Sequence, residues 1–223
     1  RQGWGEKSMN SKALTTEFIG TFALIFIGAG AAAVSGSLVA TALAHGFVVL
    51  GLAYAYGHIS GTHINPAVTI GLLVGRQIDA GTAAGYIIAQ LAGGVAGAGA
   101  LAFVLGERAG ALGATVPAEG VGTAQTFVLE LLLTFFLVNT IYNTAISGKA
   151  GNMAPVAIGL TLVFCILMGG PLTGASLNPA RSLGPALFGD APTAMSSLWI
   201  YVVACPLGGI LAALTYRFLK DPE

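Results

Sequence analysis

The chain has 223 residues, of which 55% are hydrophobic, only 8% are charged and 33 are glycine. About a quarter of the residues in soluble domains are charged, so this composition excludes an ordinary soluble domain and indicates a polytopic membrane protein. The formal net charge is zero, which gives no sign of a nucleic-acid partner. Residues 1–8 lack the apolar stretch of a signal peptide.

Apolar segments of two lengths occur along the chain. A bilayer-spanning helix needs about 20 predominantly apolar residues. Segments of about that length are expected to span at 13–34, 38–57, 82–105, 123–146, 154–170 and 197–219. Two further apolar segments, 65–75 and 178–188, are too short to cross and are typical of half-helices that re-enter the membrane. The expected fold class is an all-α membrane protein with six transmembrane helices and two re-entrant half-helices.

The same tripeptide opens both half-helices. Asn is a preferred helix N-cap, and Pro suits the first helical position because its missing N–H is not needed there. The residues concerned are Asn65, Pro66, Ala67, Asn178, Pro179 and Ala180.

A shift of 113 residues, from 65 to 178, also brings Glu17 onto Glu130. The chain is therefore expected to be a single domain, 1–223, made of two copies at about 13–105 and 123–219. Three spans per copy make the second copy enter from the opposite side, as an inverted repeat. Basic residues gather on one side of this topology, so both termini are expected to be cytoplasmic.

Three ionisable residues, Glu17, Glu130 and Arg181, lie within or beside apolar segments, where such groups are functional candidates. Because the two glutamates match, we expect both to accept hydrogen bonds from the loop that leads into a half-helix. A proton relay is the alternative. Arg181 has no counterpart, since Val68 matches it, and its five donors are expected to line a pore.

Neither a metal site nor an enzyme constellation is expected. The histidines, His45, His58 and His63, have no Cys or Asp close by in the sequence. Cys165 and Cys205 lie in apolar spans and are expected to be buried small side chains rather than a disulfide.

The sequence resembles the aquaporins, the major intrinsic protein family, along essentially its whole length. The resemblance rests on Glu17-Phe-Ile-Gly-Thr-Phe, Ser60-Gly-Thr-His-Ile-Asn-Pro-Ala-Val, Gln90-Leu-Ala-Gly-Gly and Ser176-Leu-Asn-Pro-Ala-Arg-Ser-Leu-Gly-Pro. It implies a passive water pore in each protomer of a homotetramer in the lipid bilayer, most naturally the cell membrane. No cofactor is implied.

The resemblance also implies roles for individual residues. The side-chain amides of Asn65 and Asn178 would donate into the pore, and the half-helix dipoles would oppose cations and protons. A ladder of carbonyl acceptors would come from Gly61, Thr62, His63, Ile64, Gly174, Ala175, Ser176 and Leu177. The narrow selectivity filter would be His45, Ile166, Ala175 and Arg181, with His45 and Arg181 as donors.

This filter is similar to that of plant tonoplast intrinsic proteins, which pass water and often ammonia, urea or hydrogen peroxide. Glycerol facilitators carry an Asp and a basic residue where this chain has Ser182 and Ala186. A water channel is therefore expected, with a glycerol or polyol facilitator as the alternative. A closed structural membrane protein and an ion-coupled transporter are alternatives from other classes. Ala175 stands where some members carry a mercury-sensitive Cys, so weak mercury inhibition is expected.

Overall fold

The computed structural model describes residues 10–220, and every regular element within that range is helical. Helices long and apolar enough to cross a membrane run over Ser11–Ser35, Leu38–Tyr56, Ala80–Arg108, Thr123–Ile146, Gly151–Thr173 and Ala194–Leu219. The expected spans are confirmed to within a few residues at each end. The expectation about residues 1–8 lies outside the described residues.

Several of the spans are composed of more than one element. In chain order the elements are α1 (Ser11–Ala23), the π-helical turn η1 (Leu24–Ala29), α2 (Gly30–Ser35), α3 (Leu38–Tyr56), the half-helix α4 (Pro66–Val74), α5 (Ala80–Leu105), the 3-10 turn η2 (Gly106–Arg108), α6 (Thr123–Ile141), the π-helical turn η3 (Tyr142–Ile146), the 3-10 turn η4 (Gly151–Met153), α7 (Ala154–Thr173), the half-helix α8 (Pro179–Phe188) and α9 (Ala194–Leu219).

The boundaries that differ from the prediction include the end of the fifth span and the start of the sixth. The fifth span was expected to end at residue 170, but α7 continues through Pro171 to Thr173. A proline so near the end removes only one hydrogen bond, and Gly174 then ends the helix with a left-handed φ of 79°. The sixth span begins at Ala194, three residues before the expected 197.

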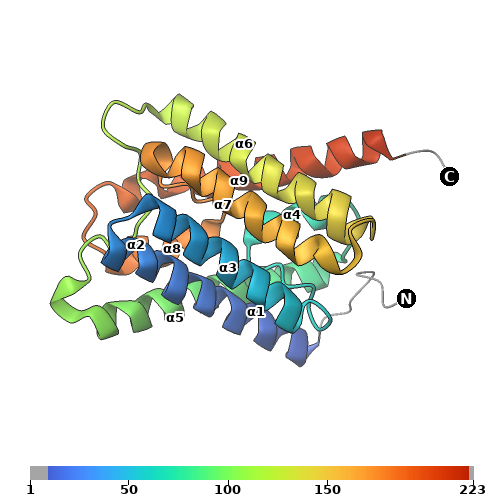
Figure 1. The fold of residues 1–223 in the computed structure, drawn as a ribbon, viewed down its shortest axis with the longest axis horizontal. Helices are drawn as coiled ribbons and strands as arrows, with labels where there is room; N and C mark the ends of the chain where they lie inside the picture. The colour runs from blue at the N-terminus through green and yellow to red at the C-terminus, as the bar shows by residue number, and fades with distance from the viewer. Residues whose placement is uncertain (1–9, 221–223) are drawn as a thin grey trace.

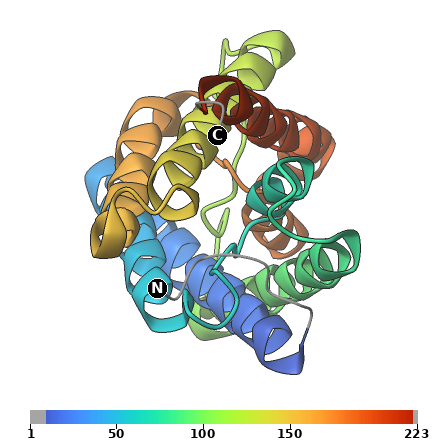
Figure 2. The ribbon, with the colours of Figure 1, turned by 90° about the vertical axis from the view of Figure 1, so that its right-hand side faces the viewer.

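The spans lie side by side as a bundle, and the first residues of α1 and the last of α9 lie at the same end of the molecule (Figure 1). Viewed along the bundle, the spans surround the two half-helices (Figure 2). Within each copy the first span packs on the third, as α1 on α5 and α6 on α9. Each half-helix packs on the third span of the other copy, as α4 on α9 and α8 on α5. The two copies therefore interlock.

Glycines permit this interlock because they let backbones approach closely. A Cβ added at Gly94 would lie 2.8 Å from the Ala180 carbonyl oxygen, and one at Gly209 would lie 2.5 Å from that of Ala67. Ala67 and Ala180 match at the shift of 113 residues, whereas Gly94 and Gly209 match at 115 (209 minus 94). The third spans of the two copies thus match at a shift two residues longer than the half-helices do. The shift of 113 residues alone did not predict this difference.

The glycines of α5 differ in how closely they pack against other elements. Side chains added at Gly93 or Gly97 would meet the α1 carbonyls of Phe18 and Phe22. One added at Gly81 would meet only the side chain of Asp79. Close packing of α5 therefore belongs to its middle and not to its start.

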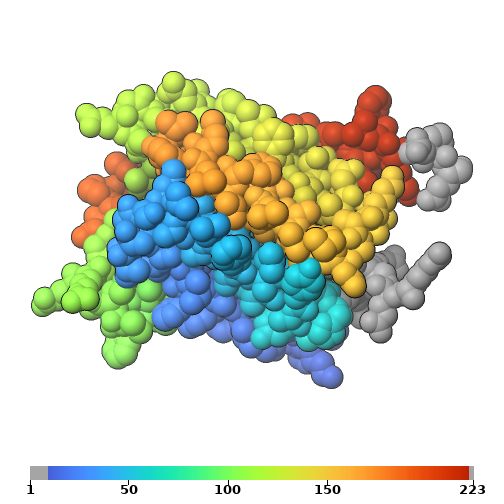
Figure 3. Space-filling model, viewed as in Figure 1, coloured from blue at the N-terminus to red at the C-terminus, as the bar shows by residue number. Residues whose placement is uncertain are grey.

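Large apolar side chains are exposed on each of the six spans. Helices α3, α7 and α6 lie side by side across the face shown in Figure 3. Large apolar side chains of these helices are exposed, including Phe47, Phe164 and Phe136. Soluble monomers rarely carry such extended apolar surface. The molecule is an integral, multi-pass membrane protein.

Gly94→Ala is expected to lower the stability of the fold, because the added methyl group would push α5 away from the Ala180 carbonyl. Overpacking of this kind costs about 1–3 kcal/mol, or roughly 2–10 °C in apparent melting temperature. Thermal unfolding of the detergent-solubilised protein measures it. Gly51→Ala is the control, because nothing lies within 4 Å of a Cβ there. Equal melting temperatures for the two variants would contradict the packing described.

Candidate functional site: a cavity between two half-helices

Each half-helix begins at an asparagine that caps it. Oδ1 of Asn65 accepts a hydrogen bond from the Ala67 N–H at 2.8 Å. Oδ1 of Asn178 accepts from the N–H groups of Ala180 at 2.9 Å and Arg181 at 3.3 Å. Proline occupies the first helical position in both. The tripeptides thus form the helix starts that their sequence predicts.

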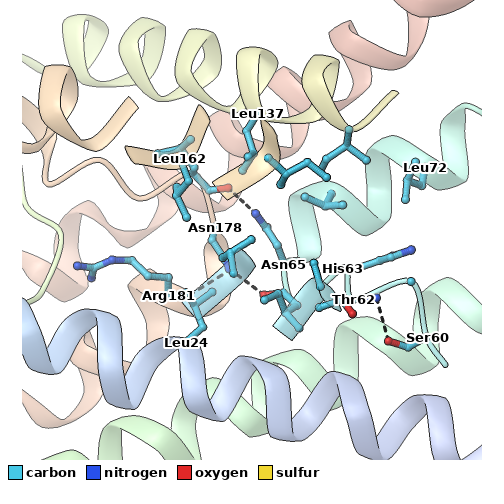
Figure 4. Close-up of a pocket in the computed structure, with 18 of the residues that line it drawn as sticks. Leu24, Ser60, Thr62, His63, Asn65, Leu72, Leu137, Leu162, Asn178 and Arg181 are labelled. Atoms are coloured by element: carbon cyan, nitrogen blue, oxygen red, sulfur yellow. Dashed lines mark hydrogen bonds between the residues drawn. The ribbon is translucent and has the colours of Figure 1, made fainter. Parts of the chain in front are cut away.

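The two asparagines also bond across to the opposite loop. Nδ2 of Asn65 donates to the Leu177 carbonyl at 2.8 Å, and Nδ2 of Asn178 donates to the Ile64 carbonyl at 2.9 Å (Figure 4). A side-chain amide has two N–H groups, so one is used here and one remains. The expectation of an amide wholly free to donate into a pore is therefore too simple. These bonds hold the two N-termini head to head.

Glu17 supports the first loop from behind. Its buried carboxylate accepts hydrogen bonds from the backbone N–H groups of His63 at 2.9 Å and Ile64 at 2.6 Å. It also accepts from the Ser60 hydroxyl at 2.6 Å and the Gln90 amide at 2.7 Å. An ionised carboxylate can only accept, and all four partners donate, so the geometry suits the charged form.

Glu130 repeats this arrangement in the second copy. It accepts from the Ser176 and Leu177 N–H groups, each at 3.0 Å, and from the Thr173 hydroxyl at 2.7 Å. Its fourth donor is the Cys205 thiol at 3.6 Å. A thiol is a weaker donor than the amide of Gln90. The second loop is therefore tied less firmly to its third span.

Two tyrosines complete the framework, and sequence reasoning missed them. The Tyr86 hydroxyl donates to the Ser60 carbonyl at 2.9 Å, and the Tyr201 hydroxyl donates to the Thr173 carbonyl at 2.8 Å. Tyr86 and Tyr201 match at the 115-residue shift (201 minus 86), as do Gln90 and Cys205. That second shift was the available signal.

The supported loops adopt an unusual backbone. Thr62 and Ile64 have φ values of 50° and 44°, and Ala175 and Leu177 have 44° and 54°. Positive φ is uncommon for residues other than glycine and costs on the order of 1–3 kcal/mol each. The strained Ile64 and Leu177 are held through their own N–H groups by the two glutamates. The framework therefore maintains a loop shape that the chain would not adopt alone.

A cavity of about 70 Å³ passes both asparagines. At roughly 10–15 Å³ for each water molecule, it holds a handful of waters. Figure 4 places the asparagines in its middle, Arg181 at one end, and His63 and Ser60 towards the other. Its polar lining comes from the two loops and from His45, Gln77 and Arg181. Its apolar lining includes Leu24, Val49, Val68, Leu72, Leu137, Ile141, Ile158 and Leu162.

The structure brings some of the predicted pore residues to the cavity and leaves others away from it. The loop residues that line the cavity are Gly61, Thr62, His63, Ile64, Ser176 and Leu177, whereas Gly174 and Ala175 do not. Of the expected filter, His45 and Arg181 line the cavity. Ile166 and Ala175 are each 2% exposed and belong to the apolar cluster that also contains the lining residues Leu137 and Leu162.

Arg181 and His45 present unpartnered nitrogens. Within residues 10–220, no hydrogen-bond partner faces Nε and Nη1 of Arg181 or Nε2 of His45. The Arg181 donors are therefore available to a molecule in the cavity. Nδ1 of His45 lies 2.9 Å from the Thr41 carbonyl, which can only accept. In the neutral ring Nε2 is then an acceptor, whereas the expectation of a donor at this nitrogen corresponds to the protonated ring.

A chain of hydroxyl groups links α8 to the loop before α6. Oγ1 of Thr115 lies 2.6 Å from Oγ of Ser182, which lies 2.6 Å from Oγ of Ser176. A Cβ at Gly174, which ends α7, would meet Thr115. The Thr115 loop therefore packs on the end of α7 and bonds to α8 through Ser182. No sequence pattern indicated this contact.

The histidines and cysteines form no metal cluster in the part of the chain that the structure describes. Instead, Nδ1 of His63 lies 3.1 Å from the Thr69 hydroxyl, and its ring packs edge-on against Tyr86. Cys165 and Cys205 are buried free thiols.

Two capped half-helices that meet inside a bundle of membrane spans, beside a cavity lined by loop backbone, define a channel fold. The model of the Major intrinsic protein family matches residues 5–216, and the chain belongs to that family. Its members are channels rather than enzymes, and the aquaporins among them pass water or small solutes through membranes.

The relatives include both water channels and glycerol facilitators by name. The chain is 45% identical over 213 residues to "Glycerol uptake facilitator protein-like 6" of Lactiplantibacillus plantarum, covering 93% of this chain and 97% of that protein. It is 39% identical over 232 residues to "Aquaporin Z" of Rhodopseudomonas palustris, covering 96% and 95%. It is 40% identical over 222 residues to "Probable aquaporin TIP-type" of Medicago truncatula, covering 93% and 86%.

A solved structure shares the fold. The aquaglyceroporin from Plasmodium falciparum superposes with a TM-score of 0.84 at 25% identity, over 93% of this chain and 96% of that one. The relatives and the solved structure therefore establish the family and the fold. The solute has to be inferred from the residues of the site.

Glu130→Gln is expected to destabilise the protein. The glutamine NH₂ group would replace one carboxylate oxygen, so that a donor faces the N–H or hydroxyl groups that bond to this oxygen in the parent protein. A buried donor left without an acceptor costs about 3 kcal/mol, or roughly 6–12 °C in melting temperature. Thermal unfolding in detergent measures the change. Glu119→Gln is the matched control, because Glu119 is exposed. A melting temperature unchanged from that of the parent would show that the carboxylate does not support the loop.

Proposed function

We propose that this protein is a passive water channel, moderately permeable to ammonia, hydrogen peroxide and urea. One observation carries the proposal: the polar lining of the cavity comes from the two loops, both asparagines, His45, Gln77 and Arg181, and apolar side chains form the rest. The polar groups replace the hydrogen bonds that a water molecule loses on entry. The apolar wall binds water weakly enough for it to leave, as conduction requires.

Proton exclusion is proposed to come from Asn65 and Asn178. The second N–H of each amide would donate to the oxygen of a passing water and so orient it. The two half-helix N-termini add positive potential at the same place. Arg181 would add a full positive charge against cations. The channel would thus exclude protons and ions.

The filter is proposed to be His45, Ile166, Ala175 and Arg181. Ile166 and Ala175 are apolar and give a wider, less polar opening than aromatic or hydroxyl side chains would. This opening favours small neutral solutes besides water. Ser182 and Ala186 favour water over glycerol, by the resemblance already described.

A glycerol facilitator is the second candidate, and the name of the 45% identical relative favours it. A closed structural membrane protein is disfavoured, because the cavity passes both asparagines.

We further propose a homotetramer of single channel domains, each with repeats at about 13–105 and 123–219. Both termini would be cytoplasmic, in the cell membrane, and the protein would need no cofactor and catalyse no reaction. The start of α1 and the end of α9 lie at the same end of the molecule, which fits that orientation (Figure 1).

Stopped-flow light scattering on proteoliposomes tests the choice of solute. Osmotic steps with an impermeant sugar report water, and gradients of glycerol or ammonium report those solutes. We expect fast water flux, little glycerol flux, and ammonia-driven alkalinisation above that of empty vesicles. Glycerol flux comparable to water flux would favour the facilitator instead.

Ala175→Cys is expected to make water flux sensitive to mercuric chloride, because position 175 is proposed to border the filter. The parent is the matched control: Cys165 and Cys205 are buried, and weak inhibition is expected. Osmotic water flux with and without mercury measures the effect. Equal inhibition of the variant and the parent by mercury would show that Ala175 does not border the filter.

A further inference from the structure

The π-helical turn η1 interrupts the first span where it passes the cavity. A π-turn shifts the face on which the following residues lie, and such turns are frequent at functional sites. Gly28 lies in this turn on the buried side of the span. Its match in the second copy is Ile141, which lines the cavity with its own side chain. At this position the first copy therefore has no side chain, whereas the second copy has the large side chain of Ile141.

The ring of His45 fills that place. A Cβ added at Gly28 would lie 2.6 Å from Cδ2, 2.7 Å from Nε2 and 2.9 Å from Cε1 of His45. These contacts are too short for any side chain, so the ring rests directly on the glycine backbone. On its other side the ring is held by the bond between Nδ1 and the Thr41 carbonyl.

The position of the ring relates Gly28 to the width of the pore. His45 lines the cavity together with Arg181, whereas Gly28 is not among the lining residues. The ring therefore lies between Gly28 and the cavity. A side chain at position 28 would displace the ring, and the free space beyond it is the cavity itself.

We propose that Gly28 is a specificity-determining residue of this channel. By receiving the His45 ring against the first span, it keeps that ring out of the cavity opposite Arg181 and sets the largest solute that passes. The proposal rests on the proposed channel function and adds a position outside the four filter residues. Solutes larger than water depend on this recess more than water does, because pore diameter limits them first.

Gly28→Ala tests the proposal without disrupting the fold. The three atoms nearest to the added methyl group all belong to the far end of the His45 side chain, which can rotate. Alanine is also a better helix former than glycine. We expect an unchanged or higher melting temperature together with a narrower pore.

The experiment measures the flux of water, ammonia, hydrogen peroxide, urea and glycerol into proteoliposomes. Gly28→Ala should lower the flux of the largest solute that the parent conducts, relative to water, by about fivefold or more. If the parent conducts water alone, water flux itself should fall. Gly51→Ala, a helical glycine with open space around it, should leave every flux unchanged.

A double variant separates positioning of His45 from a general effect of the methyl group. In the His45→Ala background, Gly28→Ala should change nothing, because no ring remains to be displaced. An unchanged solute ratio in Gly28→Ala would overturn the proposal, as would an equal loss in both backgrounds. Parent protein that conducts water no faster than empty vesicles would instead overturn the channel function.

Discussion

Two buried carboxylates hold the backbone segments on which the rest of the structure depends. Inside a membrane, backbone N–H groups have no water to bond, and irregular loops survive only where protein satisfies them. Glu17 and Glu130 each satisfy two such groups and at the same time bind side chains from neighbouring segments. They thereby stabilise positive φ angles that would otherwise relax. The two loops can then present backbone to a cavity rather than to a helix.

A symmetric framework carries an asymmetric pore. The capped half-helices, the cross-bonds of the asparagines and the glycine contacts at Gly94 and Gly209 occur once in each copy. Arg181, the His45 ring and its recess at Gly28 occur in only one copy each. Symmetry thus builds the meeting point of the half-helices, where water is proposed to be oriented. The departures from symmetry belong to the proposed filter and to the glycine that supports it, where solutes are proposed to be selected.

Much of the fold could be predicted because it depends on local patterns. Hydropathy located the spans, and Asn-Pro located both half-helix starts. Features that depend on tertiary contacts could not be predicted in this way. The π-turn at Gly28 has no sequence signal, and the end of α7 beyond Pro171 depends on Gly174. The bond to Thr41 decides which His45 nitrogen can donate, and only coordinates show it. Ile166 and Ala175 are not among the residues that line the cavity, and their part in the filter is proposed from the resemblance.

The proposed function requires a pore that conducts water but blocks proton conduction at Asn65 and Asn178. The most direct test measures both in the same proteoliposomes, with osmotic water flux by light scattering and proton leak by an entrapped pH dye under an imposed potential. The account predicts water flux well above that of empty vesicles, with a low activation energy and no added proton leak. Proton leak that rises together with water flux would contradict it, because the asparagines would then not interrupt the water file.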